Sequence, residues 1–227
     1  SSDGYFVQKF EEEFAKWSGN KYAIAVCNGT AALETAIWSL NIKHPAKIVI
    51  PSSTIISCAI VVLKLRYELG FVEDFTLSFI DYPLLLETPL KAILIPHLFG
   101  QYKQIDKSIL LPIIEDASQY WKPFKVKDVA CYSLYANKLI TSGEGGIIVT
   151  NNKDIYNRAR SYRNLCHSEE RFIHNDLGYN FRMSNLQGAV ALAQLEQIDK
   201  FIEIKQKNRD LYKKYLPDNV KFLADVE

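Results

Sequence analysis

The sequence lacks closely paired cysteines, long apolar runs and any excess of charge. None of its four cysteines (Cys27, Cys58, Cys131 and Cys166) forms a C-x-x-C pair, so we interpret them as reduced, buried hydrophobic residues and predict no metal site. The longest apolar stretch, residues 55–65, is too short to cross a bilayer and contains Lys64. Lysine and arginine number 27 against 26 aspartates and glutamates, which gives no electrostatic reason to expect nucleic acid or an anionic membrane as a partner.

Targeting and modular features are also absent. No charged leader precedes an apolar segment, so no signal peptide is visible and a cytoplasmic enzyme is expected. There are no internal repeats, low-complexity tracts or flexible linkers. We therefore expect residues 1–227 to form one catalytic domain.

Short apolar strands alternate with amphipathic helices along most of the chain. The pattern predicts strands at residues 22–26, 47–50, 70–72, 77–80, 92–96, 111–115, 128–133 and 146–150. It predicts helices at 8–17, 30–40, 53–65, 153–166, 185–197 and 198–215, with a further strand-like run at 220–223. The helix at 185–197 is rich in alanine and leucine and should be well buried. This alternation favours an α/β fold with a doubly wound, mostly parallel sheet between two helical layers.

Ligands of such sheets bind at the carboxyl ends of the strands, where four polar clusters are expected here. The first is Asn28-Gly29-Thr30-Ala31, between a strand and a helix. Glycine allows close backbone approach, and a helix N-terminus offers N–H groups to an anion such as phosphate. The alternative is an ordinary capped helix with Thr30 as its N-cap.

The second cluster follows the strand at 111–115 and contains Asp116 and Gln119. An acid at a strand end can be a helix cap or an ion-pair partner. It can also pair with a pyridinium nitrogen, in which case Gln119 would contact a phenolic oxygen.

The third cluster runs from Ser133 to Lys138 and is followed by the glycine-rich turn 143–146. Most lysines are solvated, and Lys138 could be one of them. A lysine that forms a Schiff base must instead be desolvated or lie beside another cation, so that its amine is free at neutral pH. The uncharged surroundings of Lys138 leave this second interpretation open.

The fourth cluster, residues 178–185, leads into the alanine-rich helix. Ser184 could simply cap that helix, and Arg182 could form a structural ion pair or contact a substrate or a partner subunit. His97, at a predicted strand end, is interpreted as structural more readily than as a substrate contact.

Taken in order, these segments resemble the DegT-type sugar-nucleotide aminotransferases, which are fold-type I pyridoxal-phosphate enzymes. The resemblance extends from about residue 6 to residue 215. It rests on NGTAAL (28–33), IPSST (50–54), PHLFGQ (96–101), IEDASQ (114–119), SLYANKLITSGEGG (133–146) and GYNFRMSNLQGAVALAQL (178–195). The lysine and Arg182 segments are most similar to perosamine and viosamine synthases, which make 4-amino-4,6-dideoxy sugars.

The resemblance implies a function and a set of residue roles. The expected reaction moves an amino group from glutamate to a nucleotide-linked 4-keto-6-deoxy sugar, with pyridoxal 5′-phosphate as cofactor. Lys138 would hold the cofactor and Asp116 would keep its ring nitrogen protonated. The remaining cofactor-binding residues implied are Gly29, Thr30 and Ser133 at the phosphate, Gln119 near the ring hydroxyl, Ile55 on the ring, and Asn180 reaching the phosphate of a neighbouring subunit. A homodimer with shared active sites is therefore implied.

Three departures from the family pattern stand out. Relatives usually have an aromatic ring at the position of Ile55, which can pack on the cofactor but cannot stack on it. The stretches 70–90 and 119–128 are shorter than usual. The N-terminal arm and most of the small C-terminal domain of the family lie outside these residues, so the chain is expected to be one domain of a longer protein.

Other functions remain open on the same fold. A sugar 3-dehydratase carries histidine at the Schiff-base position, where this chain has Lys138. A 3-aminotransferase, or a non-catalytic sensor or scaffold, would keep the same framework. A nicotinamide-binding domain is set aside because its G-x-G-x-x-G turn is absent.

Overall fold

The computed structural model describes residues 4–73, 88–106, 108–170, 172–217 and 219–223. Seven strands form one sheet in the order β1-β7-β6-β5-β4-β2-β3. The strands are β1 (Tyr22–Val26), β2 (Lys47–Pro51), β3 (Glu68–Val72), β4 (Leu90–Pro96), β5 (Ile113–Asp116), β6 (Val129–Ser133) and β7 (Gly146–Thr150). Within this sheet only β7 runs opposite to the other strands, pairing antiparallel with β1 and β6, so the prediction of a mostly parallel sheet is confirmed.

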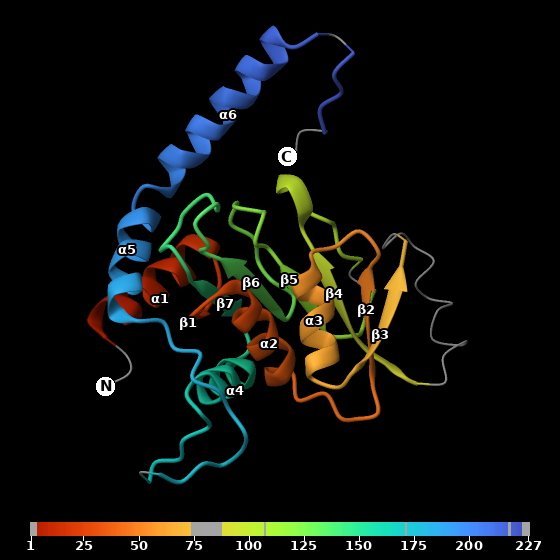
Figure 1. Cartoon of the computed structure of the whole chain (residues 1–227), viewed down its shortest axis with the longest axis vertical. Helices are drawn as coiled ribbons and strands as arrows, with labels where there is room; N and C mark the ends of the chain where they lie inside the picture. Colours follow the sequence, from red (N-terminus) through yellow and green to blue (C-terminus); the bar gives the residue numbers. More distant parts are fainter. Residues whose placement is uncertain (1–3, 74–87, 107, 171, 218, 224–227) are drawn as a thin grey trace.

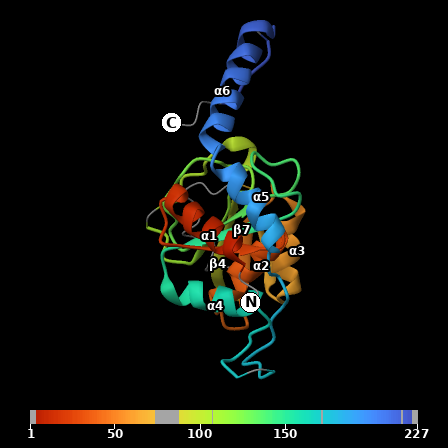
Figure 2. The same cartoon turned by 90° about the vertical axis from the view of Figure 1, so that its left-hand side faces the viewer.

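Helices cover both faces of this sheet (Figures 1 and 2). They are α1 (Tyr5–Ser18), α2 (Gly29–Ser39), α3 (Ile56–Lys64), α4 (Lys153–Arg163), α5 (Asn185–Leu195) and α6 (Ile198–Tyr215), with a short 3-10 turn at Leu98–Gly100. One apolar core joins α2, α3 and α4 to one face of the sheet, and a second joins α1 and α5 to the other. Strand side chains alternate between the two cores, as in a pleated sheet buried on both sides.

Local sequence signals account for most helix ends. The helix α1 ends at Gly19, which adopts the left-handed conformation (φ 73°) typical of a helix C-terminus. Ser184 and Gln187 form a reciprocal capping box at the start of α5, so the capping interpretation of Ser184 is confirmed. The helix α6 matches its predicted range, and the other observed helices differ from theirs by a few residues at their ends, where helix boundaries are least defined.

Two of the sequence predictions are wrong, and a third cannot be compared with the structure. The helix α5 is only half buried, because its one large helical contact is with α1 and Leu186 and Val190 remain 79% and 45% exposed. The run at 220–223 forms no strand, since it lies beside α6, where Arg209 donates a hydrogen bond to the Leu223 carbonyl, rather than beside a sheet edge. The predicted strand at 77–80 falls outside the described residues.

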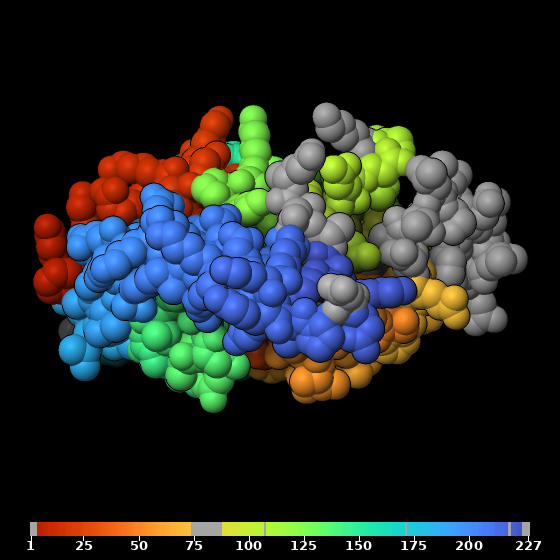
Figure 3. Space-filling view, turned by 90° about the horizontal axis from the view of Figure 1, so that it is seen from above, coloured from red at the N-terminus to blue at the C-terminus, as the bar shows by residue number. Residues whose placement is uncertain are grey.

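The helix α6 projects away from the sheet and the helices that cover its two faces (Figure 1). Only its first residue, Ile198, is fully buried. In the view from above, α6 extends over the middle of the molecule (Figure 3). Within the described residues, no helix combines the length and apolar character needed to cross a membrane.

Candidate functional site

The carboxyl ends of β1, β5 and β6 meet at one edge of the sheet, beside the N-termini of α2 and α3. In Figure 1 this is the upper edge. A cavity of about 560 Å³ opens there. Predicted site residues from four separate segments line it: Gly29, Thr30, Ile55, Asp116, Ser133 and Lys138. The fold therefore brings together residues that lie more than one hundred positions apart in the sequence.

The first turn of α2 forms the part of the cavity suited to an anion. Asn28, and not Thr30, is the N-cap: its extended backbone (φ −165°) lets Oδ1 accept a hydrogen bond from the Ala31 amide at 2.8 Å. The alternative of a Thr30 cap is wrong for this reason. The amides of Gly29 and Thr30 precede the first intrahelical bonds and remain available to an anion in the cavity that both residues line.

Gly29 lies close to the end of β6. A Cβ atom at this position would come within 2.8 Å of the Ser133 Cβ and 3.1 Å of its Oγ. Ordinary carbon contacts are about 3.5–4.0 Å. Glycine is therefore required by the close approach of α2 to β6, which places the Ser133 hydroxyl beside the free helix amides.

Asp116 is the buried carboxylate of the cavity, with only 3% of its surface exposed. Its Oδ1 accepts from the Ser118 amide at 2.9 Å, and its Oδ2 accepts from the Cys58 thiol at 3.3 Å. In the described part of the chain, no lysine or arginine forms an ion pair with it. A buried carboxylate held only by neutral donors suits a positively charged partner supplied by a ligand.

Cys58 takes part in this arrangement as a donor. Burial, followed by the negative charge of Asp116, raises the pKa of its thiol well above the ordinary value. The thiol therefore keeps its proton and orients one oxygen of the carboxylate. The sequence interpretation of Cys58 as a buried hydrophobic residue missed this contact.

Lys138 is half-buried and follows β6 by one tight turn, in which its amide donates to the Tyr135 carbonyl at 2.9 Å. The loop beyond it returns to the sheet through three hydrogen bonds at Leu134. The Leu134 carbonyl accepts from the Ser142 amide and the Thr141 hydroxyl, and the Leu134 amide donates to the Gly145 carbonyl. Gly143 has φ 81° in this turn, which agrees with the expected role of the glycine cluster.

A second cavity, of about 1080 Å³, adjoins the first between the sheet edge and α6. Lys138, Asn137 and Ser118 line both cavities. Gln119 lines only the second, and its Oε1 accepts from the Phe99 amide at 2.8 Å. The structure therefore places Gln119 beside Lys138 and Ser118 but outside the cavity that contains Asp116.

The other candidates lie apart from both cavities. Asn180 is exposed and bridges to Asn164 in a short antiparallel contact, and Arg182 donates to the Asn164 side chain at 2.7 Å. His97 is fully buried and lines neither cavity, which favours its structural interpretation over a substrate contact.

The sequence reading also missed an ion pair on the cavity wall. Lys64 Nζ lies 2.7 Å from Glu34 Oε2, and Glu34 Oε1 accepts from the Tyr162 hydroxyl at 2.8 Å. The ammonium also lies 4.7 Å from the centre of the Tyr179 ring. A glutamate within the apolar helix at 30–40, and a lysine near the end of the apolar stretch at 55–65, were the available signals.

The sheet order and the set of residues at its edge define a class of protein. This is the α/β fold of the large domain of pyridoxal-phosphate aminotransferases. More specifically, the chain belongs to the DegT/DnrJ/EryC1/StrS aminotransferase family, whose model matches residues 1–225.

Individual relatives agree with this assignment. The chain is 35% identical to the GDP-perosamine synthase of Escherichia coli O157:H7 over an alignment of 244 positions, which covers 100% of this chain and 66% of that protein. It is 33% identical over 225 residues to the GDP-perosamine synthase of Caulobacter vibrioides, covering 91% and 61%. A DegT/DnrJ/EryC1/StrS aminotransferase structure from Brucella abortus superimposes with a TM-score of 0.88 at 26% identity, covering 96% and 65%. The chain thus spans less than two thirds of the length of each of these proteins.

Proposed function

We propose that this domain belongs to a pyridoxal-phosphate-dependent aminotransferase, which moves an amino group from glutamate to a nucleotide-linked 4-keto-6-deoxy sugar. One observation carries the proposal: Lys138, Asp116 and the amide-rich start of α2 line a single cavity. The two GDP-perosamine synthases support an amino-sugar product linked to a nucleotide.

The residues present fit the cofactor. The Gly29 and Thr30 amides, with the Ser133 hydroxyl held close by the absence of a Cβ at Gly29, match a phosphate group. Asp116, buried and without a cationic partner among the described residues, matches a protonated ring nitrogen. Lys138 would provide the amine that holds the cofactor covalently, and Ile55 would pack against its ring.

The chemistry divides between the cofactor and the protein. When bound, pyridoxal phosphate accepts the electrons left behind as the amino donor loses its α-proton. Lys138 Nζ would take that proton and deliver it again, since it is the amine that lines both cavities. Asp116 would keep its negative charge opposite the ring nitrogen, with the Cys58 thiol and the Ser118 amide fixing its two oxygens.

A homodimer with active sites near the subunit interface accompanies this function. Three large apolar side chains on the outer face of α3 are exposed: Ile56 by 68%, Ile60 by 48% and Leu63 by 57%. Their spacing places them on one stripe, next to Ser57 and Lys64 of the cavity wall. A second copy covering α3 would bury this stripe and could bring its own Asn180 toward the phosphate. Light scattering of an Ile60→Asp variant should then show loss of the dimer.

Replacement of Lys138 tests the function directly. Lys138→Ala should abolish both the absorbance band that pyridoxal phosphate produces with the protein and turnover, because no other lysine is expected to provide the amine. Thermal unfolding should be unchanged, since the side chain is only half-buried. The exposed Lys125 offers a matched control, and Lys125→Ala should keep both properties.

The assay uses the full-length protein, glutamate, and a panel of GDP-, dTDP- and UDP-linked 4-keto-6-deoxy sugars. Full turnover by Lys138→Ala would end the proposal. Tight cofactor binding without turnover of any sugar on the panel would instead favour a non-catalytic role.

A further inference from the structure

Glu115 and Asp116 are consecutive residues of β5, and their side chains lie on opposite faces of the sheet. Asp116 lines the cavity, whereas Glu115 is 1% exposed and lines neither cavity. Glu115 lies beside a cluster of packed rings formed by His97, Tyr102, Tyr120 and Phe124. A carboxylate in such surroundings is costly unless its oxygens accept hydrogen bonds.

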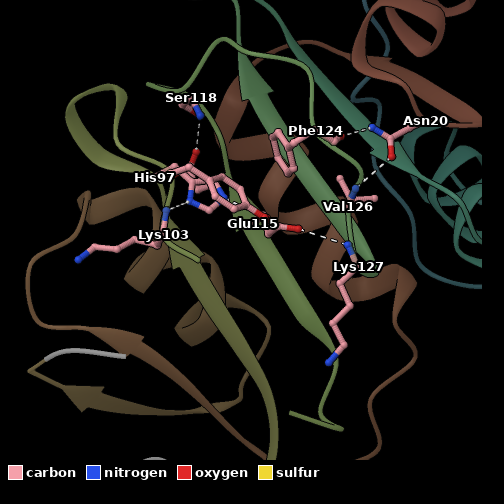
Figure 4. A network of polar contacts seen from close by, with 10 residues as sticks. Asn20, His97, Lys103, Glu115, Ser118, Phe124, Val126 and Lys127 are labelled. Atoms are coloured by element: carbon pink, nitrogen blue, oxygen red, sulfur yellow. Dashed lines mark hydrogen bonds and ion pairs between the residues drawn. The ribbon is translucent and has the colours of Figure 1, made fainter. Parts of the chain in front are cut away.

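Glu115 has three hydrogen-bond donors, of which His97 and Lys127 are labelled in Figure 4. Its Oε2 lies 3.0 Å from His97 Nε2 and accepts from the Tyr102 hydroxyl at 3.3 Å. Its Oε1 accepts from the Lys127 amide at 3.4 Å. The segment that contains Lys127 is also tied to Asn20, which bonds the Phe124 carbonyl at 2.9 Å and the Val126 amide at 3.2 Å. Glu115 is therefore hydrogen-bonded to a segment that is anchored to Asn20, outside both cavities.

The hydrogen bonds of His97 identify its tautomer. The Lys103 amide, which can only donate, lies 3.2 Å from Nδ1. Nδ1 is therefore the accepting nitrogen, and the proton is on Nε2, which donates to Glu115. Both ring nitrogens are engaged within the protein, and the fully buried ring has no free nitrogen for a ligand.

His97 and Glu115 are connected through the backbone to two of the predicted cofactor-binding residues, Asp116 and Gln119. The His97 amide donates to the Asp116 carbonyl at 2.9 Å, which joins the ends of β4 and β5. The turn that follows is held at its far side by the bond from Lys103 to His97. Within it, Phe99 adopts a left-handed conformation (φ 56°) that is unfavourable for a bulky residue, and its amide donates to Gln119 at 2.8 Å.

We propose that His97 and Glu115 are positioning residues: through the 98–103 turn they hold Gln119 beside Lys138 in the second cavity, and through the strand end they hold Asp116 in the first cavity, where the cofactor is expected. This inference rests on the proposed function. It assigns no contact with cofactor or substrate to either residue. Their effect is to fix the rear wall of the site from the opposite face of the sheet.

The decisive variant is Glu115→Gln, which keeps the shape of the side chain but replaces one accepting oxygen with a donor. The glutamate half-reaction of the pyridoxal-phosphate-loaded protein, followed by absorbance, needs no sugar substrate. Its rate should fall about 10- to 100-fold, the scale expected when catalytic groups shift by about 1 Å. The KM for glutamate should stay within about twofold, because no binding contact is lost.

A cofactor-free readout accompanies the kinetics. Hydrogen exchange of the Phe99 and Lys103 amides should accelerate at least about tenfold in Glu115→Gln, because the turn loses its anchor. If the variant fails to fold, Tyr102→Phe removes a single donor to Glu115 and should give smaller changes of the same kind.

The matched control is Glu11→Gln. Glu11 is a largely buried carboxylate that accepts from the Ala25 amide at 2.8 Å and pairs with Arg163, away from both cavities. It should lose stability without slowing the half-reaction. Equal slowing in both variants, or unchanged kinetics and exchange in Glu115→Gln, would overturn the positioning role. A wild-type protein that binds no cofactor would refute the proposed function, and the exchange measurement would still test whether Glu115 holds the turn.

Discussion

Substitution of Gly29 by alanine tests how much the close packing of the start of α2 against the end of β6 contributes to cofactor binding. The added Cβ would lie 2.8 Å from the Ser133 Cβ, an atom fixed to the backbone, so rotation of the serine side chain cannot relieve the clash. Either the start of α2 or the end of β6 must move by up to about 1 Å to restore normal contact. Both segments contribute to the expected phosphate site.

The expected magnitudes separate stability from binding. Overpacking typically costs about 1–3 kcal/mol, and the higher helix propensity of alanine offsets up to about 1 kcal/mol of this. We therefore expect a net loss of about 0–2 kcal/mol in the free energy of unfolding. Loss of one hydrogen bond to a charged phosphate costs about 1.5–3 kcal/mol. The dissociation constant of pyridoxal phosphate should accordingly rise about 10- to 150-fold.

Gly188→Ala provides the matched control. Its Cβ would come within 2.9 Å of the Val7 amide nitrogen, a clash of similar severity between α5 and α1. Urea unfolding should show comparable destabilisation, while titration with pyridoxal phosphate should show wild-type affinity. Wild-type affinity in Gly29→Ala, or an equal loss in both variants, would refute the reasoning.

Two further predictions concern groups around the cavity. Burial and the charge of Asp116 raise the pKa of Cys58, and burial raises that of Cys131, so neither thiol should be alkylated in the folded protein at mildly alkaline pH. The half-buried Cys27 should react first in mass-spectrometric mapping, and equal labelling of Cys58 would contradict the assignment. Tyr162→Phe removes the hydrogen bond to the buried Glu34 and should lower the free energy of unfolding by about 1.5–3 kcal/mol. Tyr215→Phe, at a ring that is 73% exposed, should change it by less than about 0.5 kcal/mol in the same urea titration.

Much of the fold follows from short-range patterns. The β1 and β7 boundaries match their predicted ranges, because apolar runs with clear turn residues leave little freedom in where an element starts. The boundaries of α6 also match, and this helix ends two residues before Pro217. The burial of α5 could not be predicted in this way. Its sequence is rich in alanine and leucine, but one side faces outward because only α1 packs broadly against it.

The candidate site, too, could be predicted only in part. The positions of Asp116, Ser133 and Lys138 at strand ends were predictable, since parallel strands bring their carboxyl ends to one edge. The partners of these residues were not. Cys58 lies 58 positions from Asp116. The Phe99 amide that holds Gln119 lies in the connection between β4 and β5, whereas Gln119 lies in the connection between β5 and β6.

The sequence by itself determined which chemical groups the chain carries and, through local periodicity, which of them end strands or begin helices. Only the tertiary structure decided which of the two neighbouring acids of β5 lines the cavity and which partner each one has. Asp116 accepts a hydrogen bond from the Cys58 thiol in the cavity, whereas Glu115 accepts one from His97 on the other face of the sheet. The physical reason is that hydrogen bonds act over about 3 Å between residues that packing alone brings together, and no local pattern encodes those pairs.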